Sequence, residues 1–345
     1  MAMVKADAYG HGAVEVSKKL ERCGARAFGV ATVEEGIELR DAGVGLPVLV
    51  MGGLLGAGAP ASRAMVEAEL TPVIHSSGVL SSLSAEARSA GKKIKAHIKV
   101  DTGMSRLGVR PEALPAFLDE IKRHPAIEIE GVMTHLACAD DEEASAKQMR
   151  LFMRARETIE SSLGVVPVWH VANSGAILRG SPVEVEGAGE CWARPGLALY
   201  GEANGFLQSG EGLRPVMGLE SRAVLIKSIP EGTPVSYGGI FTTNRLTRIA
   251  IVPVGYADGY PWRASGKASV LAGCMRCPVL GRVTMDMIVV DVSDAKDFSV
   301  NDAVVLLGRQ GDEEISLSEL AGWADTISYE ILCGISKRMP RIYKG

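Results

Sequence analysis

The sequence has 345 residues, which at about 150 residues per domain predicts about two domains. Hydrophobic residues make up 47% and charged residues 23%, close to the globular average, and this composition excludes a disordered or fibrous chain. The 37 Lys and Arg residues are balanced by 41 Asp and Glu residues, a net charge of −4 that argues against a protein that coats nucleic acid or an acidic membrane. We therefore expect a soluble two-domain enzyme.

The six cysteines are scattered along the chain and do not form a disulfide framework. The first residues lack the basic and apolar regions of a signal peptide, and no stretch reaches the roughly 18 apolar residues of a membrane span. These features favour a reduced, cytoplasmic protein. Cys274 and Cys277 form the only CxxC, and because Pro278 follows them we expect a β-turn with two incidental thiols and no metal site.

The first 200 residues alternate β-type runs with helical runs. The β-type runs end near Val4, Val30, Val50, Ile74, Val100, Met133, Val171 and Ala193. The helical runs between them include Ala13–Cys23, Val33–Asp41, Ser62–Glu69 and Glu142–Leu163. Eight such units predict an α/β fold, a (β/α)₈ barrel of the TIM type.

The competing fold is a doubly wound sheet that binds a dinucleotide. Its fingerprint is missing, because Gly10-His11-Gly12 is followed three residues on by Glu15 instead of Gly, and no P-loop motif is present. The acidic residues 140–143 are expected to form the first turn of a helix, and His11, His97 and His170 are expected to be structural.

The pattern changes after about Leu213. Long β-type runs follow at Ser221–Ile229, Arg248–Val254, Ala268–Leu271, Val283–Val292 and Ala303–Leu307, with one clear helix around Ser316–Trp323. This predicts a mostly antiparallel, β-rich C-terminal domain. Gly205, Gly210, Gly212 and Pro215 cluster at the junction, so the predicted domains are residues 1–212 and 213–345.

The ends of three predicted strands carry residues that suit one cofactor. Lys5 ends the first strand, at the barrel mouth, where a lysine suits Schiff-base chemistry, although a solvated surface lysine is the alternative. Ser174 follows the seventh strand and Gly196 and Leu197 follow the eighth, where this fold commonly binds phosphate, although these residues could instead only shape turns. An amine facing a phosphate cradle is what pyridoxal phosphate requires.

The residues Val4-Lys5-Ala6-Asp7-Ala8-Tyr9-Gly10-His11-Gly12 resemble the pyridoxal-phosphate attachment motif of the alanine racemase family. The resemblance continues in order through nearly the whole chain. Its other motifs are Asp101–Gly108 (DTGMSRLG), Thr134-His135, Ala172-Asn173-Ser174, Arg194-Pro195-Gly196, Val235–Gly238 (VSYG), Gly255–Gly259 (GYADG) and Gly281–Asp286 (GRVTMD).

The resemblance implies roles for residues of the barrel. Lys5 would hold pyridoxal 5'-phosphate as an internal aldimine and act as one catalytic base. The phosphate group would be bound by Tyr9, Ser174, Gly196 and Leu197. Arg194 would contact the pyridine nitrogen and keep it unprotonated, which makes the cofactor a weaker electron sink, and His135 would support Arg194 by a hydrogen bond.

Further implied roles concern charge and substrate. Arg106 would contact the ring oxygen of the cofactor and the carboxylate of the substrate. Lys99 resembles the lysine that is carbamylated in the family, while an ordinary lysine paired with a carboxylate is the alternative. Lys337 stands where many members have a phosphate-contacting tyrosine; it could contact phosphate as a point charge or be solvated.

The remaining implied roles belong to a homodimer with shared active sites. Tyr237 would be the second catalytic base and reach the site from the partner subunit, and Tyr256 and Met285 would come from the same side and narrow the entrance. Family members carry a lead-in before the lysine, whereas this sequence begins at the attachment strand, and we expect that difference to affect activity and dimerisation.

The resemblance implies an alanine racemase that interconverts L- and D-alanine by two-base proton transfer and supplies D-alanine for peptidoglycan. A cofactor-carrier protein with the same barrel is disfavoured because it lacks a second domain. A decarboxylase of basic amino acids is disfavoured by the Val235–Gly238 motif. A racemase that accepts a broader range of amino acids is the remaining alternative, since the sequence does not define the volume of the substrate pocket.

Overall fold

The computed structural model describes residues 1–54, 58–180, 184–203 and 212–344. They group into two units. The first contains Met1–Ala8 and Gly12–Leu199, and the second contains Tyr9–His11, residues 200–203 and residues 212–344. Within the described ranges, none of the helices is both long and apolar enough to cross a bilayer.

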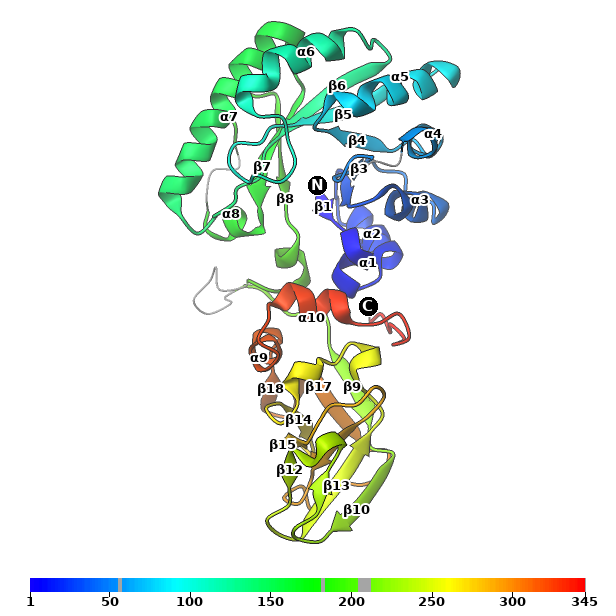
Figure 1. The fold of residues 1–345 in the computed structure, drawn as a ribbon, viewed down its shortest axis with the longest axis vertical. Helices are drawn as coiled ribbons and strands as arrows, with labels where there is room; N and C mark the ends of the chain where they lie inside the picture. The colour runs from blue at the N-terminus through cyan, green and yellow to red at the C-terminus, as the bar shows by residue number, and fades with distance from the viewer. Residues whose placement is uncertain (55–57, 181–183, 204–211, 345) are drawn as a thin grey trace. The chain divides into compact units, whose positions relative to one another are not determined.

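The first unit is built on eight parallel strands that pair in chain order (Figure 1). The strands are β1 (Ala2–Met3), β2 (Phe28–Val30), β3 (Val48–Val50), β4 (Thr71–Ile74), β5 (Ile94–Lys99), β6 (Ile127–Met133), β7 (Val168–Asn173) and β8 (Glu190–Arg194). The Met3 N–H donates to the carbonyl of Pro195 at 3.0 Å, which joins β1 to the end of β8 and brings the sheet round into a barrel. The predicted (β/α)₈ barrel is confirmed, and the doubly wound sheet is excluded.

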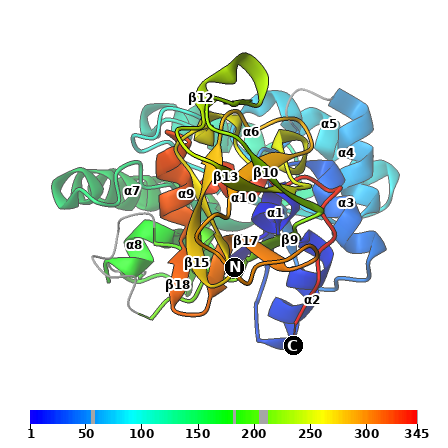
Figure 2. The same cartoon turned by 90° about the horizontal axis from the view of Figure 1, so that it is seen from below.

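Helices cover the outside of this barrel. They are α2 (Ala13–Arg22), α3 (Val33–Asp41), α4 (Gly58–Glu67), α5 (Leu80–Ser89), α6 (Leu114–Lys122), α7 (Glu142–Leu163) and the short α8 (Ser174–Leu178). In both views α4 and α5 lie side by side (Figures 1 and 2). Asp141 caps α7 by accepting the Ala144 N–H at 2.9 Å, so the acidic run at residues 140–143 begins a helix, as predicted.

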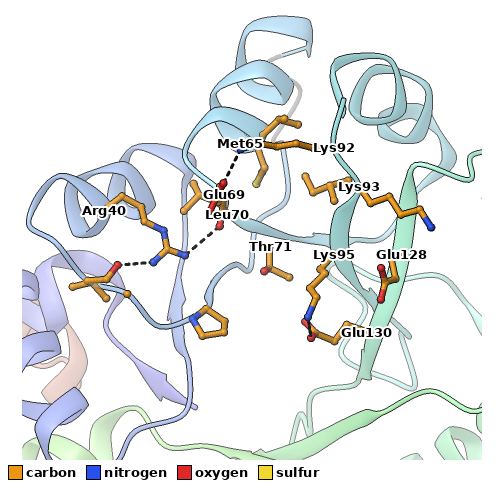
Figure 3. A pocket seen from close by; sticks show the side chains of 15 residues that line it. Arg40, Met65, Glu69, Leu70, Thr71, Lys92, Lys93, Lys95, Glu128 and Glu130 are labelled. Carbon is orange, nitrogen blue, oxygen red and sulfur yellow. Dashed lines mark hydrogen bonds and ion pairs between the residues drawn. The ribbon is translucent and has the colours of Figure 1, made fainter. Parts of the chain in front are cut away.

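The amino ends of the barrel strands form a pocket of about 550 Å³ whose charged groups are largely paired with each other (Figure 3). Lys92 pairs with Glu69 at 2.6 Å, Lys95 pairs with Glu130 at 2.5 Å, and Arg40 donates to backbone carbonyls. Charge pairs at this end suit stability, because barrel enzymes carry their chemistry at the carboxyl ends of the strands.

The segment α1 (Lys5–Gly10), one residue after β1, is a left-handed helical turn. Ala6, Asp7, Ala8 and Tyr9 have φ values between 52° and 54°. This region costs an L-residue about 1–2 kcal/mol. Sequence reasoning predicted a strand end at this point and did not predict the left-handed turn.

The second unit contains an antiparallel sheet in the order β10-β13-β16-β15-β14-β17-β18, with β9 paired to β17. The strands are β9 (Leu219–Arg222), β10 (Leu225–Ile229), β13 (Thr247–Val252), β14 (Ser269–Ala272), β15 (Met275–Leu280), β16 (Ile288–Asp291), β17 (Ala303–Gln310) and β18 (Glu313–Ile315). A separate pair joins β11 (Pro234–Val235) to β12 (Phe241–Thr242). Two helices, α9 (Leu317–Trp323) and α10 (Ser328–Gly334), complete it. The predicted β-rich domain is confirmed.

Several element boundaries in this unit differ from the prediction. The run 221–229 is two strands, because β9 pairs with β17 whereas β10 pairs with β13. The run 283–292 is a strand only from Ile288, because Thr284 and Met287 close a turn by hydrogen bonds. Helix α10 was missed: it has no side-chain cap at Ile327, whereas α9, of the same length, begins with Ser316 accepting the Glu319 N–H.

The CxxC prediction is half right. Cys274 lies in the turn between β14 and β15 with φ 60°, but Cys277 and Pro278 lie within β15. Pro278 pairs with Ser269 on one side, while the pairing of β15 with β16 begins only at Val279. At such a locally one-sided position the missing N–H of proline is tolerated in a strand.

Candidate active site

Lys5 lies one residue beyond β1, after Val4, at the carboxyl end of the barrel. The left-handed turn that begins there is held by carboxylates: Glu35 accepts the Ala6 N–H at 2.7 Å, and Asp7 accepts the Ala13 N–H at 2.8 Å. The second oxygen of Glu35 accepts the Ala31 N–H at 2.6 Å. Glu35 therefore ties the lysine turn to the loop after β2, a role that sequence reasoning missed.

Several positive charges meet at this end of the barrel. Burial, followed by the charges of Arg106 and Arg194, lowers the pKa of Lys99 to about 8, and Lys5 contributes in the same direction. Lys99 is the last residue of β5 and is 4% exposed. The repulsion between these neighbouring cations favours the neutral amine form of Lys99, and their positive charge favours an anionic ligand at the barrel mouth.

Arg194 lies in the interior at the end of β8, with 3% of its surface exposed. Its Nη2 donates to the carbonyls of Thr134 and Val171 at 2.6 and 2.9 Å and lies 3.4 Å from His135 Nδ1. Burial, followed by the charge of Arg194, lowers the pKa of His135 to about 3, so His135 is a neutral acceptor. The Nη1 of Arg194 is buried and has no hydrogen-bond partner among the described residues.

The loop that carries Thr134 and His135 is fixed by Gln148, which sequence reasoning also missed. Gln148 Nε2 donates to the His135 carbonyl at 3.1 Å and to Thr102 Oγ1 at 3.2 Å, and its Oε1 accepts the Ala137 N–H at 2.8 Å. The sequence held one indication of this role. Gln148 is the single polar residue among the buried residues of α7, which also include Phe152, Ala155 and Ile159.

The residues predicted to bind phosphate lie at the ends of β7 and β8. Ser174 Oγ accepts the Gly196 N–H at 2.8 Å and the Ala198 N–H at 3.3 Å. Leu197 begins the 3₁₀ turn η3 (Leu197–Tyr200). Because the Ser174 oxygen accepts two amides, its own proton is left to donate to an anion.

The second unit holds Tyr237, whose side chain is 73% exposed. Tyr237 starts the turn η4 (Tyr237–Gly239), and the residue before it, Ser236, has φ 63° and ψ −174°, a region suited to glycine. Ser236 Oγ donates to the Arg282 carbonyl at 2.7 Å. Gly281 permits this approach, because a Cβ there would lie 2.4 Å from the Val235 carbonyl oxygen.

Tyr256 and Met285 are also exposed, by 45% and 52%. Their loops run side by side, with the Tyr256 and Ala257 N–H groups donating to the carbonyls of Thr284 and Met285, each at 3.0 Å. Gly255 is required for this contact, since a Cβ there would meet the Thr284 carbonyl oxygen at 2.3 Å. The predicted residues Tyr237, Tyr256 and Met285 thus lie on neighbouring loops of one unit.

Tyr9 belongs to the second unit by its contacts, where its ring lies 4.9 Å from Tyr200 and 6.1 Å from Tyr329. Burial raises the pKa of Tyr9. His11 Nδ1 bonds the Tyr9 carbonyl at 2.9 Å. In the barrel, His97 Nδ1 lies 2.9 Å from His170 Nε2, and burial lowers the pKa of both rings. All three histidines are buried, which is consistent with the structural role predicted for them.

The fold and these residues define a barrel enzyme with a lysine after its first strand and positively charged residues at the carboxyl ends of its strands, in a chain that continues into a β-rich unit. The model of the alanine racemase N-terminal domain matches residues 1–204, and that of the C-terminal domain matches residues 216–343. The chain belongs to the alanine racemase family and is an isomerase of the racemase class.

Individual relatives agree with this placement. The chain is 41% identical to the alanine racemase of Halothermothrix orenii and 43% identical to that of Symbiobacterium thermophilum, in each case over 100% of this chain and 90% of the relative. The alanine racemase structure from Streptomyces lavendulae superimposes with a TM-score of 0.90 at 34% identity, covering 100% of this chain and 90% of that one. The Bacillus anthracis structure, which has bound L-Ala-P, gives 0.86 at 32%, covering 97% and 85%.

Proposed function

We propose that this chain interconverts L-alanine and D-alanine with pyridoxal 5'-phosphate as its cofactor. The observation that carries the proposal is the unpartnered, buried Nη1 of Arg194 at the mouth of the barrel that holds Lys5. A buried donor without a partner is costly, and a ring nitrogen would satisfy it.

The residues present fit the cofactor on two further grounds. Ser174 retains a hydroxyl proton beside the amides of Gly196 and Ala198, as a phosphate site requires. The cations around Lys99 favour an anionic ligand. Lys5 would hold the cofactor through Nζ, Arg194 would donate to its ring nitrogen, and Tyr9, Ser174, Gly196 and Leu197 would bind its phosphate. When bound, the cofactor supplies an electron sink that weakens the Cα–H bond of an amino acid.

The chain itself supplies two proton-transfer groups. Racemisation needs a proton removed from one face of Cα and delivered to the other, so Lys5 Nζ would serve one face and Tyr237 Oη the other. Arg106 would hold the substrate carboxylate, since a guanidinium matches a carboxylate geometrically. A neutral His135 would orient Arg194 without adding charge.

We further propose a homodimer with shared sites, in which Tyr237, Tyr256 and Met285 serve the barrel of the partner. Three large side chains exposed on neighbouring loops favour burial against another surface. The product would be D-alanine for peptidoglycan, made in the cytoplasm.

The test is a chiral assay. The purified protein, incubated with pyridoxal phosphate and each of a panel of L-amino acids, should form D-alanine fastest. Borohydride reduction should place the cofactor on Lys5. A Lys122→Ala control, at an exposed position on α6, should behave as wild type. A protein that binds no cofactor, or an adduct on another lysine, would contradict the proposal.

The same assay separates the alternatives. Cofactor binding without D-product would indicate a carrier protein, and release of CO₂ from lysine or ornithine would indicate a decarboxylase. Comparable rates with several amino acids would indicate a broad racemase.

A further inference from the structure

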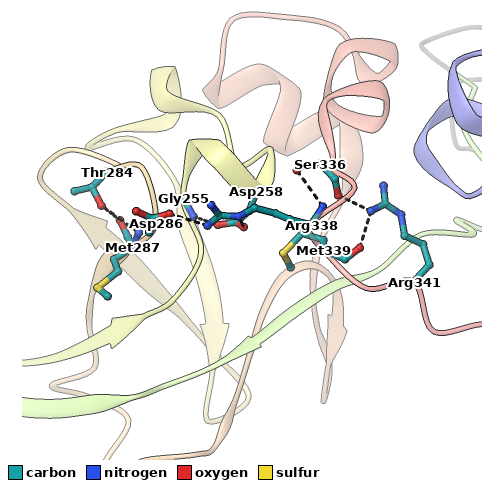
Figure 4. A network of polar contacts seen from close by, with 9 residues as sticks. All are labelled: Gly255, Asp258, Thr284, Asp286, Met287, Ser336, Arg338, Met339 and Arg341. Carbon is teal, nitrogen blue, oxygen red and sulfur yellow. Dashed lines mark hydrogen bonds and ion pairs between the residues drawn. The ribbon is translucent and has the colours of Figure 1, made fainter.

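Arg338 connects the two loops that carry Tyr256 and Met285 (Figure 4). Its Nε donates to Asp258 Oδ1 at 2.6 Å and its Nη2 donates to Asp286 Oδ1 at 2.7 Å. The Asp258 side chain is only 5% exposed, and its other oxygen accepts the Gly255 N–H at 2.8 Å. The guanidinium therefore compensates a buried carboxylate and spans from it to the second loop, as only a planar fork can.

The segment that carries Arg338 is itself fixed. The Ser336 N–H donates to the Asp258 carbonyl at 3.0 Å. Arg341 donates to the Met339 carbonyl at 2.7 Å and also to the carbonyls of Ser336 and Gly10. Arg338 thus extends from an anchored segment to both loops, with its side chain half exposed.

The side chains of Tyr256 and Met285 are about half exposed, so their placement depends on the backbone of the two loops. Among the described residues, the backbones of the two loops are joined by two hydrogen bonds, from the Tyr256 and Ala257 N–H groups to the carbonyls of residues 284 and 285. Arg338 adds a third link, at Asp286, directly beside Met285.

We propose that Arg338 is a positioning residue that sets the distance between Tyr256 and Met285 and thereby the width of the substrate entrance. The inference rests on the proposed function, because the entrance role of Tyr256 and Met285 comes from it. No residue of the loops needs to move for this role; Arg338 acts by holding them.

The first measurement is amide hydrogen exchange of Tyr256 and Ala257. Arg338→Met and Asp286→Asn should each speed this exchange about fivefold, the change expected when a linking ion pair is lost. The matched control is Arg309→Met, which removes the 2.6 Å Arg309–Glu314 pair in the β17–β18 hairpin and should leave these amides unchanged. Unchanged exchange in both test variants would overturn the proposal.

The second measurement is kinetic. Arg338→Met should raise KM for alanine about fivefold with a smaller change in kcat, and should shift the ratio of kcat/KM for serine over alanine toward serine. Arg338→Lys keeps the charge but loses the fork, so it should recover part of the effect. Faster exchange with unchanged KM and unchanged ratio would overturn the entrance role. A wild-type protein that lacks racemase activity would overturn the proposed function, and the exchange result would still show whether Arg338 fixes the loops.

Discussion

His135 Nδ1 lies 3.4 Å from Arg194 Nη2, and the pKa of His135 is lowered to about 3, first by burial and then by the charge of Arg194. In the unfolded chain a histidine titrates near pH 6.5. Between about pH 6.5 and pH 3 the unfolded state therefore binds a proton that the folded state does not. Folding stability must fall as the pH is lowered through this window and is fully present above it.

We predict that this histidine makes the protein sensitive to acid. Between pH 7 and pH 5, the free energy of unfolding in urea should fall by about 2 kcal/mol more in the wild type than in His135→Gln, which keeps an acceptor for Arg194 but does not titrate. His75→Gln, which replaces a histidine after β4, is the control. Equal falls in the wild type and His135→Gln would show that His135 does not carry the effect.

Lys99 carries the second residue-scale prediction. Its pKa is about 8, lowered by burial and then by Arg106 and Arg194, so a sizeable fraction is the neutral, nucleophilic amine at mildly alkaline pH. The neutral amine would form an N–C bond to CO₂ and release one proton, which leaves a carbamate anion that can pair with Arg106. In ¹³C-bicarbonate the wild type should show one carbamate NMR signal that Lys99→Arg lacks. A plain amine at Lys99 under these conditions would refute carbamylation.

Single residues were predictable where the fold brings strand ends together. Lys5, Ser174 and Arg194 stand at or just after the carboxyl ends of barrel strands, so their convergence could be expected before the structure was known. Glu35 and Gln148 could not be assigned in this way, because they act on backbone atoms whose positions only the folded chain defines.

At the scale of elements, the turn before Tyr237 stores strain. Ser236 occupies a backbone region that costs a non-glycine residue about 1–3 kcal/mol, and its Oγ offsets part of that cost by donating to the Arg282 carbonyl. This strained residue directly precedes Tyr237, which is proposed as the second base.

We predict different effects for two substitutions here. Ser236→Ala should lower the free energy of unfolding by about 1 kcal/mol, because it loses the hydrogen bond and keeps the strain. Ser236→Gly should change it less, because the relief of strain opposes the lost bond. Urea unfolding of both variants makes the comparison, and a larger loss in Ser236→Gly than in Ser236→Ala would contradict the argument.

The lysine turn shows why element type was easier to predict than local conformation. Ala6, Asp7, Ala8 and Tyr9 include no glycine, so nothing in local propensity indicates a left-handed turn. Glu35 stabilises the turn by accepting the Ala6 N–H within it, and Asp7 of the turn accepts the Ala13 N–H at the start of α2. Tertiary contacts override the local preference at this point.

At the scale of the whole molecule, the alternation of β-type and helical runs was enough to predict the barrel, because eight regular βα units allow few other folds. The boundary at residues 212 and 213 stays a prediction; Gly205 and Gly210, on which it partly depended, lie outside the described residues. The order of the strands in the sheet of the β-rich unit was not predictable, since short antiparallel strands can pair in many ways.

The two proposed catalytic bases lie on different units of the chain. Lys5 stands on the barrel, while Tyr237 stands on the β-rich unit with 73% of its side chain exposed. If each Tyr237 serves the barrel of a second copy, a site is complete only in a dimer, and the two catalytic bases of one site come from different chains.

We predict that two inactive variants restore each other. Tyr237→Phe should lose racemisation but still bind the cofactor at Lys5, whereas Lys5→Ala should lose both the covalent attachment and racemisation. After mild dissociation and mixing, each heterodimer has one site with both bases, so its activity should reach about half that of the wild type. Lys122→Ala mixed with Lys5→Ala controls for simple subunit exchange. Activity in a strictly monomeric wild-type sample, or no recovery in Tyr237→Phe/Lys5→Ala heterodimers whose formation is shown by native mass spectrometry, would reject the shared site.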